Sequence, residues 1–412
     1  MGKDKTYWFG ILPHVYYVKK GVRILLYNTQ NGSYIVSSDA DVIALTEEMH
    51  LKNNLGIIEL TQCQLQHSTI ATFVQESKEK NICKLQERMP NSPKPVQLMP
   101  ILNLQRDVEK LKQDKNRSVG EGIMDYLTDV TVVLNEECSC SCPGCGHYEK
   151  QFFHCSKGKT RQELAAKSVI QFLETIRYAP LRRLSFTGGD VFSYHQWDEL
   201  RNYFVGNGIT PCLGVHYLNV IGEKVDKLKD YPFEIFVTFP MNEKLFLERL
   251  EFLDGFTVKY LFSVTSENDC RTAEEIIQEH NIVNYEFRPF FNGENLAFFE
   301  KEVFLTGYDI ANMPVEQRFV FAHQKMNTNF FGQIVLLPSG DVKANPNGKS
   351  LGNIHHDHIS NMLEKELVRT DFWRKIRDQK PCVDCLFQFI CPSPSNYETV
   401  IGRPNLCMLY ND

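Results

Sequence analysis

The segment Cys138-Ser-Cys-Ser-Cys142-Pro-Gly-Cys145 follows an apolar, β-branched run, Val130 to Leu134, so we place it on a loop that leaves a strand. Three of its thiols, Cys138, Cys142 and Cys145, have the spacing C-x3-C-x2-C. Cysteine thiolates are the ligands of iron-sulfur clusters. Three thiolates on a four-iron cluster leave one iron without a protein ligand, as catalytic zinc sites keep one position open. The spacing therefore predicts a cluster with room for chemistry.

Other interpretations of this loop stay open on the motif alone. A zinc knuckle, or a cysteine-rich loop without metal, would contain the same residues, because short motifs also occur by chance. Cys140 is an additional thiol within the segment and could compete as a ligand.

The strand expected next in the chain ends in a second motif. The run Leu184-Ser-Phe-Thr-Gly188-Gly189-Asp190 is an apolar strand that leads into two glycines and a carboxylate. Glycines allow a ligand to approach the backbone closely, and a carboxylate accepts hydrogen bonds from an ammonium group. A Gly-Gly-Asp turn alone is no evidence of a ligand site, but at the tip of the strand that follows the C-x3-C-x2-C spacing it is.

Together, the two motifs resemble those of the radical S-adenosylmethionine (SAM) enzymes. In that family SAM chelates the open iron through its amino and carboxylate groups, and a Gly-Gly-Glu turn holds the amino group. The resemblance implies a [4Fe-4S] cluster on Cys138, Cys142 and Cys145, and SAM bound by Gly188, Gly189 and Asp190. An electron from the cluster would cleave SAM to a 5'-deoxyadenosyl radical, so that the cofactor performs the difficult step.

Two positions depart from the family pattern. Gly144 stands where an aromatic residue usually precedes the third cysteine, and Asp190 is one methylene shorter than the usual glutamate. These departures motivate a non-catalytic alternative, a pseudo-radical-SAM partner protein.

From Asp129 onward, strand-like and helix-like runs alternate, which predicts a parallel sheet built of βα units. A capping box of Thr160 and Glu163 is expected to open a helix. The predicted fold class is α/β, a partial (β/α)6 TIM-like barrel whose sites lie at the carboxyl ends of the strands. The remaining strands are predicted at Arg183 to Phe186, Leu213 to Val220, Glu234 to Phe239, Val258 to Thr265 and Tyr285 to Phe290.

The first residues form a pattern of their own. Three β-rich runs between Val15 and Val36 predict a meander, because Asn31-Gly32 between such runs is a strong hairpin signal. Helix starts are expected at Ser38, with Asp41 three residues on, and at Thr61, with Gln64. Ahead of a radical SAM-like core, this organisation resembles a winged-helix-like domain that recognises a leader peptide at its sheet edge. A purely structural module is the alternative.

Four further cysteines, Cys382, Cys385, Cys391 and Cys407, lie near the C-terminus. Four thiolates can enclose a metal completely, and they suit structural zinc or a [4Fe-4S] cluster equally well. With the hairpin predicted between Ile334 and Val342, these cysteines resemble the SPASM domain of peptide-modifying radical SAM enzymes.

The full SPASM pattern has more cysteines than this chain. Asn345 stands where the family has one cysteine, and Ser395 stands where another would follow Cys391. We therefore expect a single auxiliary [4Fe-4S] cluster.

The expected domains are residues 1–90 for leader recognition, 91–125 as a proline-rich linker, 126–330 as the barrel and 331–412 as the SPASM-like domain. The 412 residues carry a net charge of -6 without a basic footprint, which argues against a nucleic-acid partner. No apolar run is long enough for a membrane span and no signal peptide is present, so we expect a cytoplasmic protein without a membrane partner.

The function expected from this resemblance is a radical SAM maturase of a ribosomally synthesised precursor peptide, supplied with electrons by an external donor. Two alternatives remain. One is the non-catalytic protein that binds the precursor peptide for another maturase. The other is a zinc-stabilised interaction protein, which thirteen cysteines without a secretory signal also allow.

Overall fold

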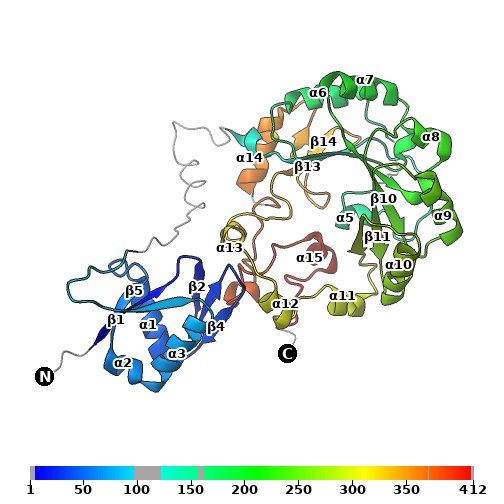
Figure 1. Ribbon diagram of the computed structural model, residues 1–412. Coiled ribbons are helices and arrows are strands. Elements are labelled where there is room, and N and C mark those ends of the chain that lie inside the picture. Colours follow the sequence, from blue (N-terminus) through cyan, green and yellow to red (C-terminus); the bar gives the residue numbers. More distant parts are fainter. Residues whose placement is uncertain (1–4, 97–121, 156–161, 370, 410–412) are drawn as a thin grey trace.

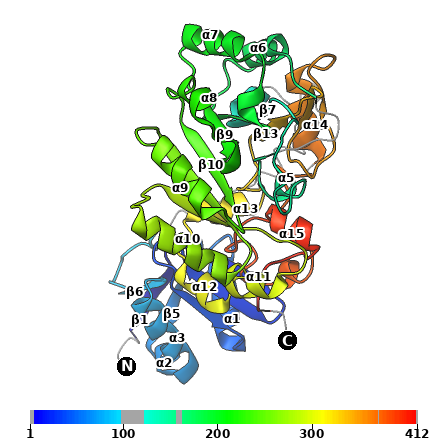
Figure 2. The same ribbon diagram turned by 90° about the vertical axis from the view of Figure 1, so that its right-hand side faces the viewer.

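The computed structural model describes residues 5–96, 122–155, 162–369 and 371–409 (Figure 1). Most of the predicted linker, residues 91–125, and Thr160 of the predicted capping box lie outside these ranges. Two views of the ribbon show an N-terminal part beside a larger body, with the C-terminal segments between them (Figures 1 and 2).

The larger body is built on a nine-stranded sheet with the order β12-β11-β10-β9-β8-β7-β13-β14-β15. Its strands β7 to β12 pair in parallel and in chain order. The predicted α/β class with a central parallel sheet is therefore confirmed, and every predicted strand forms. The parallel strands are β7 (Asp129–Val133), β8 (Arg183–Thr187), β9 (Cys212–His216), β10 (Phe233–Thr238), β11 (Val258–Val264) and β12 (Tyr285–Pro289).

Helices cover one side of this sheet and form an arc in Figure 1. All six residues of β10, an inner strand of this parallel sheet, are buried. The helices of the arc are α6 (Ala166–Thr175), α7 (Trp197–Asn207), α8 (Gly222–Asp226), α9 (Glu243–Phe252), α10 (Glu267–Glu279) and α11 (Leu296–Glu302). The short helix α5 (Tyr148–Gln151) lies inside the arc (Figure 1).

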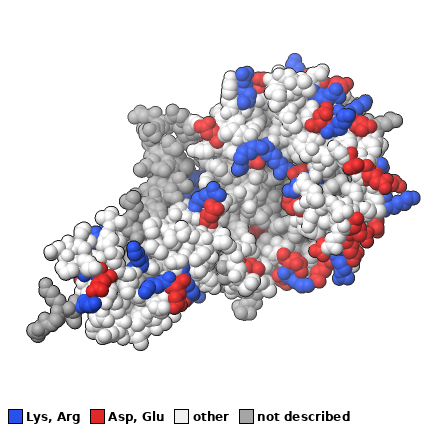
Figure 3. All heavy atoms as spheres, in the orientation of Figure 1, with Lys and Arg blue, Asp and Glu red and all other residues white. Residues whose placement is uncertain are grey.

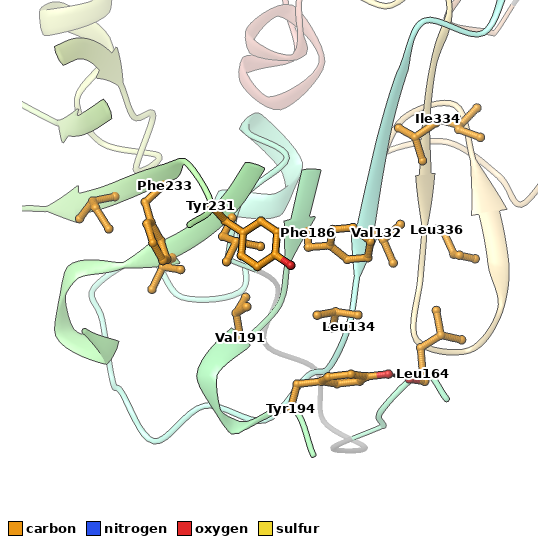
Figure 4. Packing of buried hydrophobic residues seen from close by; sticks show 14 of the residues in the cluster. Val132, Leu134, Leu164, Phe186, Val191, Tyr194, Tyr231, Phe233, Ile334 and Leu336 are labelled. Atoms are coloured by element: carbon orange, nitrogen blue, oxygen red, sulfur yellow. Dashed lines mark hydrogen bonds between the residues drawn. The ribbon is translucent and has the colours of Figure 1, made fainter. Parts of the chain in front are cut away.

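The core between sheet and helices is continuous from β10 to β13 (Gln333–Leu336). Figure 4 shows Phe186 of β8 close to Val132 of β7, with Leu336 of β13 on the far side of Val132. Each of these side chains is fully buried. Burying an aliphatic or phenylalanine side chain contributes about 1.5–3 kcal/mol, so this core holds the strand ends that carry the site.

Helix α6 differs from the prediction at its start. It begins at Ala166, and Ala165, its N-cap residue, makes no side-chain capping bond. Glu163 forms an isolated bridge with Asn135, and its carboxylate is bound to His195. The helix starts later than predicted because Glu163 is engaged in this bridge with Asn135. The buried residues of this helix include Val169, Phe172 and Leu173, which form its apolar face.

The N-terminal part contains two three-stranded sheets, β5-β1-β6 and β2-β3-β4. The predicted meander is confirmed as the second sheet, and the capping box of Thr61 and Gln64 is present. Asp39, one residue after the predicted Ser38, caps the first helix. The elements are β1 (Thr6–Ile11), β2 (Val15–Lys20), β3 (Arg23–Asn28), β4 (Tyr34–Ser37), α1 (Ala40–His50), β5 (Ile57–Thr61), α2 (Gln62–Gln66), α3 (Ser68–Glu79) and β6 (Cys83–Glu87).

The C-terminal segments join the other two parts. Strand β13 pairs in parallel with β7, and the predicted hairpin continues the central sheet through β14. The sheet β2-β3-β4 packs through Leu25 and Tyr27 on Leu386 and Ile390, beside Cys391 and Cys407. The remaining elements are α12 (Gly307–Asn312), α13 (Gln317–His323), β14 (Asp341–Lys343), β15 (Gly352–Asn353), α14 (Ile359–Arg369) and α15 (Asn396–Ile401).

Charged side chains of both signs are interspersed over the face shown in Figure 3, with no large area of one sign. Among the described residues, no helix has the length and apolar character needed to cross a membrane.

Candidate functional site

The cysteine loop begins two residues after the end of β7 with Asn135, whose side chain is fully buried. Its backbone oxygen accepts the Gly189 N–H at 3.0 Å, and its amide nitrogen donates to the Asp190 oxygen at 2.8 Å. The stem of the cysteine loop is thus hydrogen-bonded to the turn at the tip of β8. The residues that lead into the cysteine motif are therefore in direct contact with the glycine motif.

The glycines of that turn make this contact possible. A Cβ on Gly188 would lie 2.5 Å from Asn135 Oδ1, and one on Gly189 would overlap the Glu137 carbonyl oxygen. Only glycine fits at both positions, because the close approach is to the stem of the cysteine loop. The glycines therefore have a structural partner in addition to the predicted ligand.

Asn219 joins the same two loops from a third strand end. It lies in the 3-10 turn Tyr217–Asn219 that follows β9, and it is 4% exposed. Its amide nitrogen donates to the Gly189 oxygen at 3.0 Å, and its amide oxygen accepts the Cys140 thiol at 3.0 Å. The same nitrogen lies 3.8 Å from Cys138 Sγ. The extra thiol that the sequence presented as a competing ligand thus has a protein partner.

The loop thiols lie close enough to one another to affect each other's ionisation. Burial, followed by the charges of Cys138 and Cys142, raises the pKa of Cys140. Burial raises the pKa of the neighbouring Cys155 thiol well above its ordinary value, and all four loop cysteines add to that rise. Soft thiols gathered at the carboxyl ends of parallel strands suit an iron-sulfur cluster.

Aromatic side chains around Tyr148 pack against the cysteine loop. Gly144 has a φ of +76°, and a Cβ there would lie 2.7 Å from Cε1 of Phe290. Tyr148 packs on Phe290 with ring centroids 4.4 Å apart, and its hydroxyl donates to the Pro143 oxygen. Burial raises the pKa of Tyr148. The space beside Gly144 is therefore filled by aromatic side chains from elsewhere in the chain.

A buried ion pair lies on the same side of the sheet. Glu234 of β10 binds Arg183 of β8 and accepts a hydrogen bond from His154 Nε2 at 2.8 Å. Burial opposes ionisation of Glu234, but the hydrogen bond from His154 and the nearby arginine charge outweigh it and lower its pKa. Burial lowers the pKa of His154, which is therefore a neutral donor.

The four C-terminal cysteines line one cavity together with Arg377. The Arg377 guanidinium contacts the Cys382 thiol, and its Nη2 donates to Glu398 Oε1 at 2.8 Å. Both side chains of this ion pair are buried, at 9% and 5% exposure. Four thiols in one enclosure suit a fully ligated metal or cluster.

Asn345 and Ser395 stand where the SPASM pattern would have further cysteines. Asn345 is fully buried, and its amide nitrogen donates to Asn396 Oδ1 at 2.8 Å. Ser395 caps α15 through a capping box with Glu398. These two positions are thus built into a hydrogen-bonded structure.

The described cysteines are all free thiols. Within the described ranges, no group of three or more His, Cys, Asp or Glu side chains is arranged as a site for a metal ion. The assignments of Cys138, Cys142, Cys145, Cys382, Cys385, Cys391 and Cys407 as ligands therefore remain predictions.

Asn219, Tyr148 and Arg377 were not identified from the sequence. The place of Asn219 after a strand was a usable signal, because sites of such folds lie at the carboxyl ends of strands. The strand predicted from Leu213 to Val220 ran past it, whereas β9 ends at His216. Arg377 carried no comparable signal.

No protein-family model and no curated protein matches this sequence. Solved structures similar to the chain include SuiB of Streptococcus suis bound to its precursor peptide SuiA, with 12% identity, 97% of this chain and 98% of that chain covered and a TM-score of 0.43. SuiB bound to S-adenosylmethionine covers 96% and 97%, at 10% identity and a TM-score of 0.45. A third, anSMEcpe with bound AdoMet, covers 64% and 87%, at 12% identity and a TM-score of 0.44.

Proposed function

We propose that this chain is a radical SAM enzyme that modifies a ribosomally synthesised precursor peptide. The observation that carries the proposal is the direct contact between the cysteine loop and the Gly188–Asp190 turn, which Asn219 joins from a third strand end. A site for SAM needs a cluster and a binder of its amino group side by side, and this contact supports such an arrangement.

In this proposal Cys138, Cys142 and Cys145 hold a [4Fe-4S] cluster, and Asp190 with the two glycines before it binds SAM. When bound, the cluster and SAM supply the electron and the 5'-deoxyadenosyl radical that removes hydrogen from the peptide. The protein holds the two loops together through Asn135 and keeps water away with the aromatic cluster around Tyr148.

The C-terminal cysteines would hold one auxiliary [4Fe-4S] cluster. The hydrogen bond from Asn345 to Asn396 and the cap that Ser395 forms with Glu398 support a single cluster, because a second one would need thiols at Asn345 and Ser395. An external donor would supply the electrons, and the protein would work in the cytoplasm.

The precursor peptide would bind to the N-terminal part as an added strand. Among the described strands, β4 pairs only with β3, which leaves one edge of that sheet for another strand. Since this sheet packs on the C-terminal segments, a peptide held there would be tethered near the larger body.

The test is release of 5'-deoxyadenosine from SAM by anaerobically reconstituted, reduced protein. We expect the wild-type chain to bind iron and cleave SAM, and Cys142→Ala to lose cleavage. Iron-loaded wild-type protein that never cleaves SAM would remove the enzymatic claim.

A non-catalytic peptide-binding partner is the second candidate. One oxygen of Asp190 accepts the Phe192 N–H at 3.0 Å, so part of the carboxylate is engaged in capping the following turn. This candidate predicts precursor-peptide binding by the wild-type chain with no SAM turnover, and equal peptide binding by Cys142→Ala.

A further inference from the structure

A buried histidine at the end of β9 faces the middle cysteine of the loop. His216 is 2% exposed, and its Nε2 lies 3.5 Å from Cys142 Sγ and 3.1 Å from Thr238 Oγ1. Thr238 is the last residue of the neighbouring strand β10. Two adjacent strands thus end in polar side chains that face the cysteine loop.

The hydrogen-bonding pattern fixes the tautomer of this histidine. The Leu218 N–H donates to His216 Nδ1 at 3.2 Å, so Nδ1 is the acceptor nitrogen. A neutral imidazole carries one proton, which must then be on Nε2. Nε2 therefore donates, and the Cys142 sulfur is an acceptor rather than a donor in this contact.

The same donor begins a chain of hydrogen bonds that returns to the loop. The Thr238 hydroxyl shares the single Nε2 proton of His216 with the Cys142 sulfur, as a second acceptor, and is hydrogen-bonded to the Tyr148 hydroxyl. The Tyr148 hydroxyl donates to the Pro143 oxygen. Each hydroxyl has a single proton, and that of Tyr148 is used in the bond to Pro143. The Thr238 hydroxyl must therefore donate to the Tyr148 oxygen, so that every bond of the chain is donated in the direction from His216 to Pro143.

We propose that His216 is a positioning residue for the loop cluster, donating an N–H···S hydrogen bond to the Cys142 thiolate while its second branch through Thr238 and Tyr148 fixes the Pro143 carbonyl. The proposal rests on the proposed function. Hydrogen bonds to the sulfurs are one of the factors that set the reduction potential of an iron-sulfur cluster. Withdrawing electron density from one thiolate favours the reduced cluster, so His216 raises the potential of the loop cluster.

The test is a redox titration of the reconstituted full-length protein, followed by electron paramagnetic resonance. The signal absent from Cys142→Ala identifies the loop cluster, and the C-terminal cluster serves as an internal control. We expect His216→Leu to move the midpoint of the loop signal to a more negative potential and to leave the other midpoint unchanged. His216→Gln, whose amide N–H can replace Nε2–H, should move it back toward the wild-type value.

A third variant separates the two branches. Thr238→Val removes the hydroxyl with little change of shape, so Cys142 retains its donor and the midpoint should not become more negative. If the loop cluster does not assemble in His216→Leu, the other two variants decide. A wild-type midpoint potential in His216→Gln, together with no negative shift of that potential in Thr238→Val, still supports the proposal.

Unchanged midpoints in His216→Leu, or in His216→Gln a shift as negative as that expected for Leu, would overturn it. Those results leave the proposed function intact, because the cluster is then present and SAM is still cleaved. A wild-type chain that binds no iron-sulfur cluster would instead overturn both.

Discussion

The two cysteine groups of this chain are held in different ways. Around the loop group the nearest partners are neutral donors and acceptors, His216 and Asn219, at the ends of strands. Beside the C-terminal group stands a charged residue, Arg377, buried with its partner Glu398. The N-terminal sheet also packs against the C-terminal group. We therefore expect the C-terminal group to contribute more to the stability of the fold than the loop group does.

The largest expected effect is a difference in thermal stability between variants of the two cysteine groups. Because a fully ligated metal site contributes its binding free energy to folding, Cys385→Ala should lower the midpoint of thermal unfolding by roughly 10 °C. Cys142→Ala should lose about four iron atoms per chain with little change of that midpoint. Calorimetry and iron analysis of both variants provide the measurement. Equal losses of thermal stability would show that both groups are structural.

The next effect isolates the charged residue. Arg377→Gln leaves the Glu398 carboxylate buried without its partner, and removing one member of a buried pair lowers the free energy of unfolding by about 3 kcal/mol. Arg403→Gln is the matched control, because the Arg403–Glu300 pair is about one-third exposed. Its loss should change the free energy of unfolding by less than about 1 kcal/mol. Denaturant titration of both variants tests the difference, and equal values would contradict it.

The sequence predicted the features of these regions that depend on near neighbours in the chain, and it missed those that depend on distant segments. Local patterns identified the parallel strands, the meander and the capping box at Thr61, because alternation and capping depend on near neighbours. The sheet β5-β1-β6 was missed, since β1 pairs with segments about fifty and about eighty residues away, and such contacts leave no local pattern.

The candidate site was predicted unevenly for the same reason. The cysteine and glycine motifs are short and were found, and their contact through Asn135 agrees with strand ends that lie together. The residues that hold the loop come from other strand ends. His216 is 74 positions from Cys142 in the chain, and the predicted strand that ran to Val220 concealed its position at the end of β9.

A third prediction concerns the loop group alone. Gly144 and Gly146 both have positive φ, +76° and +82°, but only at Gly144 would a Cβ meet a ring, that of Phe290. Gly146→Ala should lower the free energy of unfolding by about 1 kcal/mol, the penalty of a left-handed backbone. Gly144→Ala should lower it by about 2 kcal/mol and reduce iron loading, because the buried ring must also move. Equal losses would show that the ring beside Gly144 is easily displaced.

The smallest expected effect is the contribution of the buried Glu234 carboxylate to stability, measured by acid titration. Glu234 has a lowered pKa in the folded protein, so it stabilises the fold above the ordinary glutamate pKa of 4.5 and loses that contribution as the pH falls below it. Arg183, its partner, is 41% exposed and partly screened by solvent. We therefore expect only about 1 kcal/mol between pH 4.5 and pH 3. In Glu234→Gln the free energy of unfolding should fall less steeply over that interval, because no carboxylate remains to be protonated at this position. Parallel curves for the two proteins would mean that the loop region, unlike the C-terminal one, owes nothing to its buried charge.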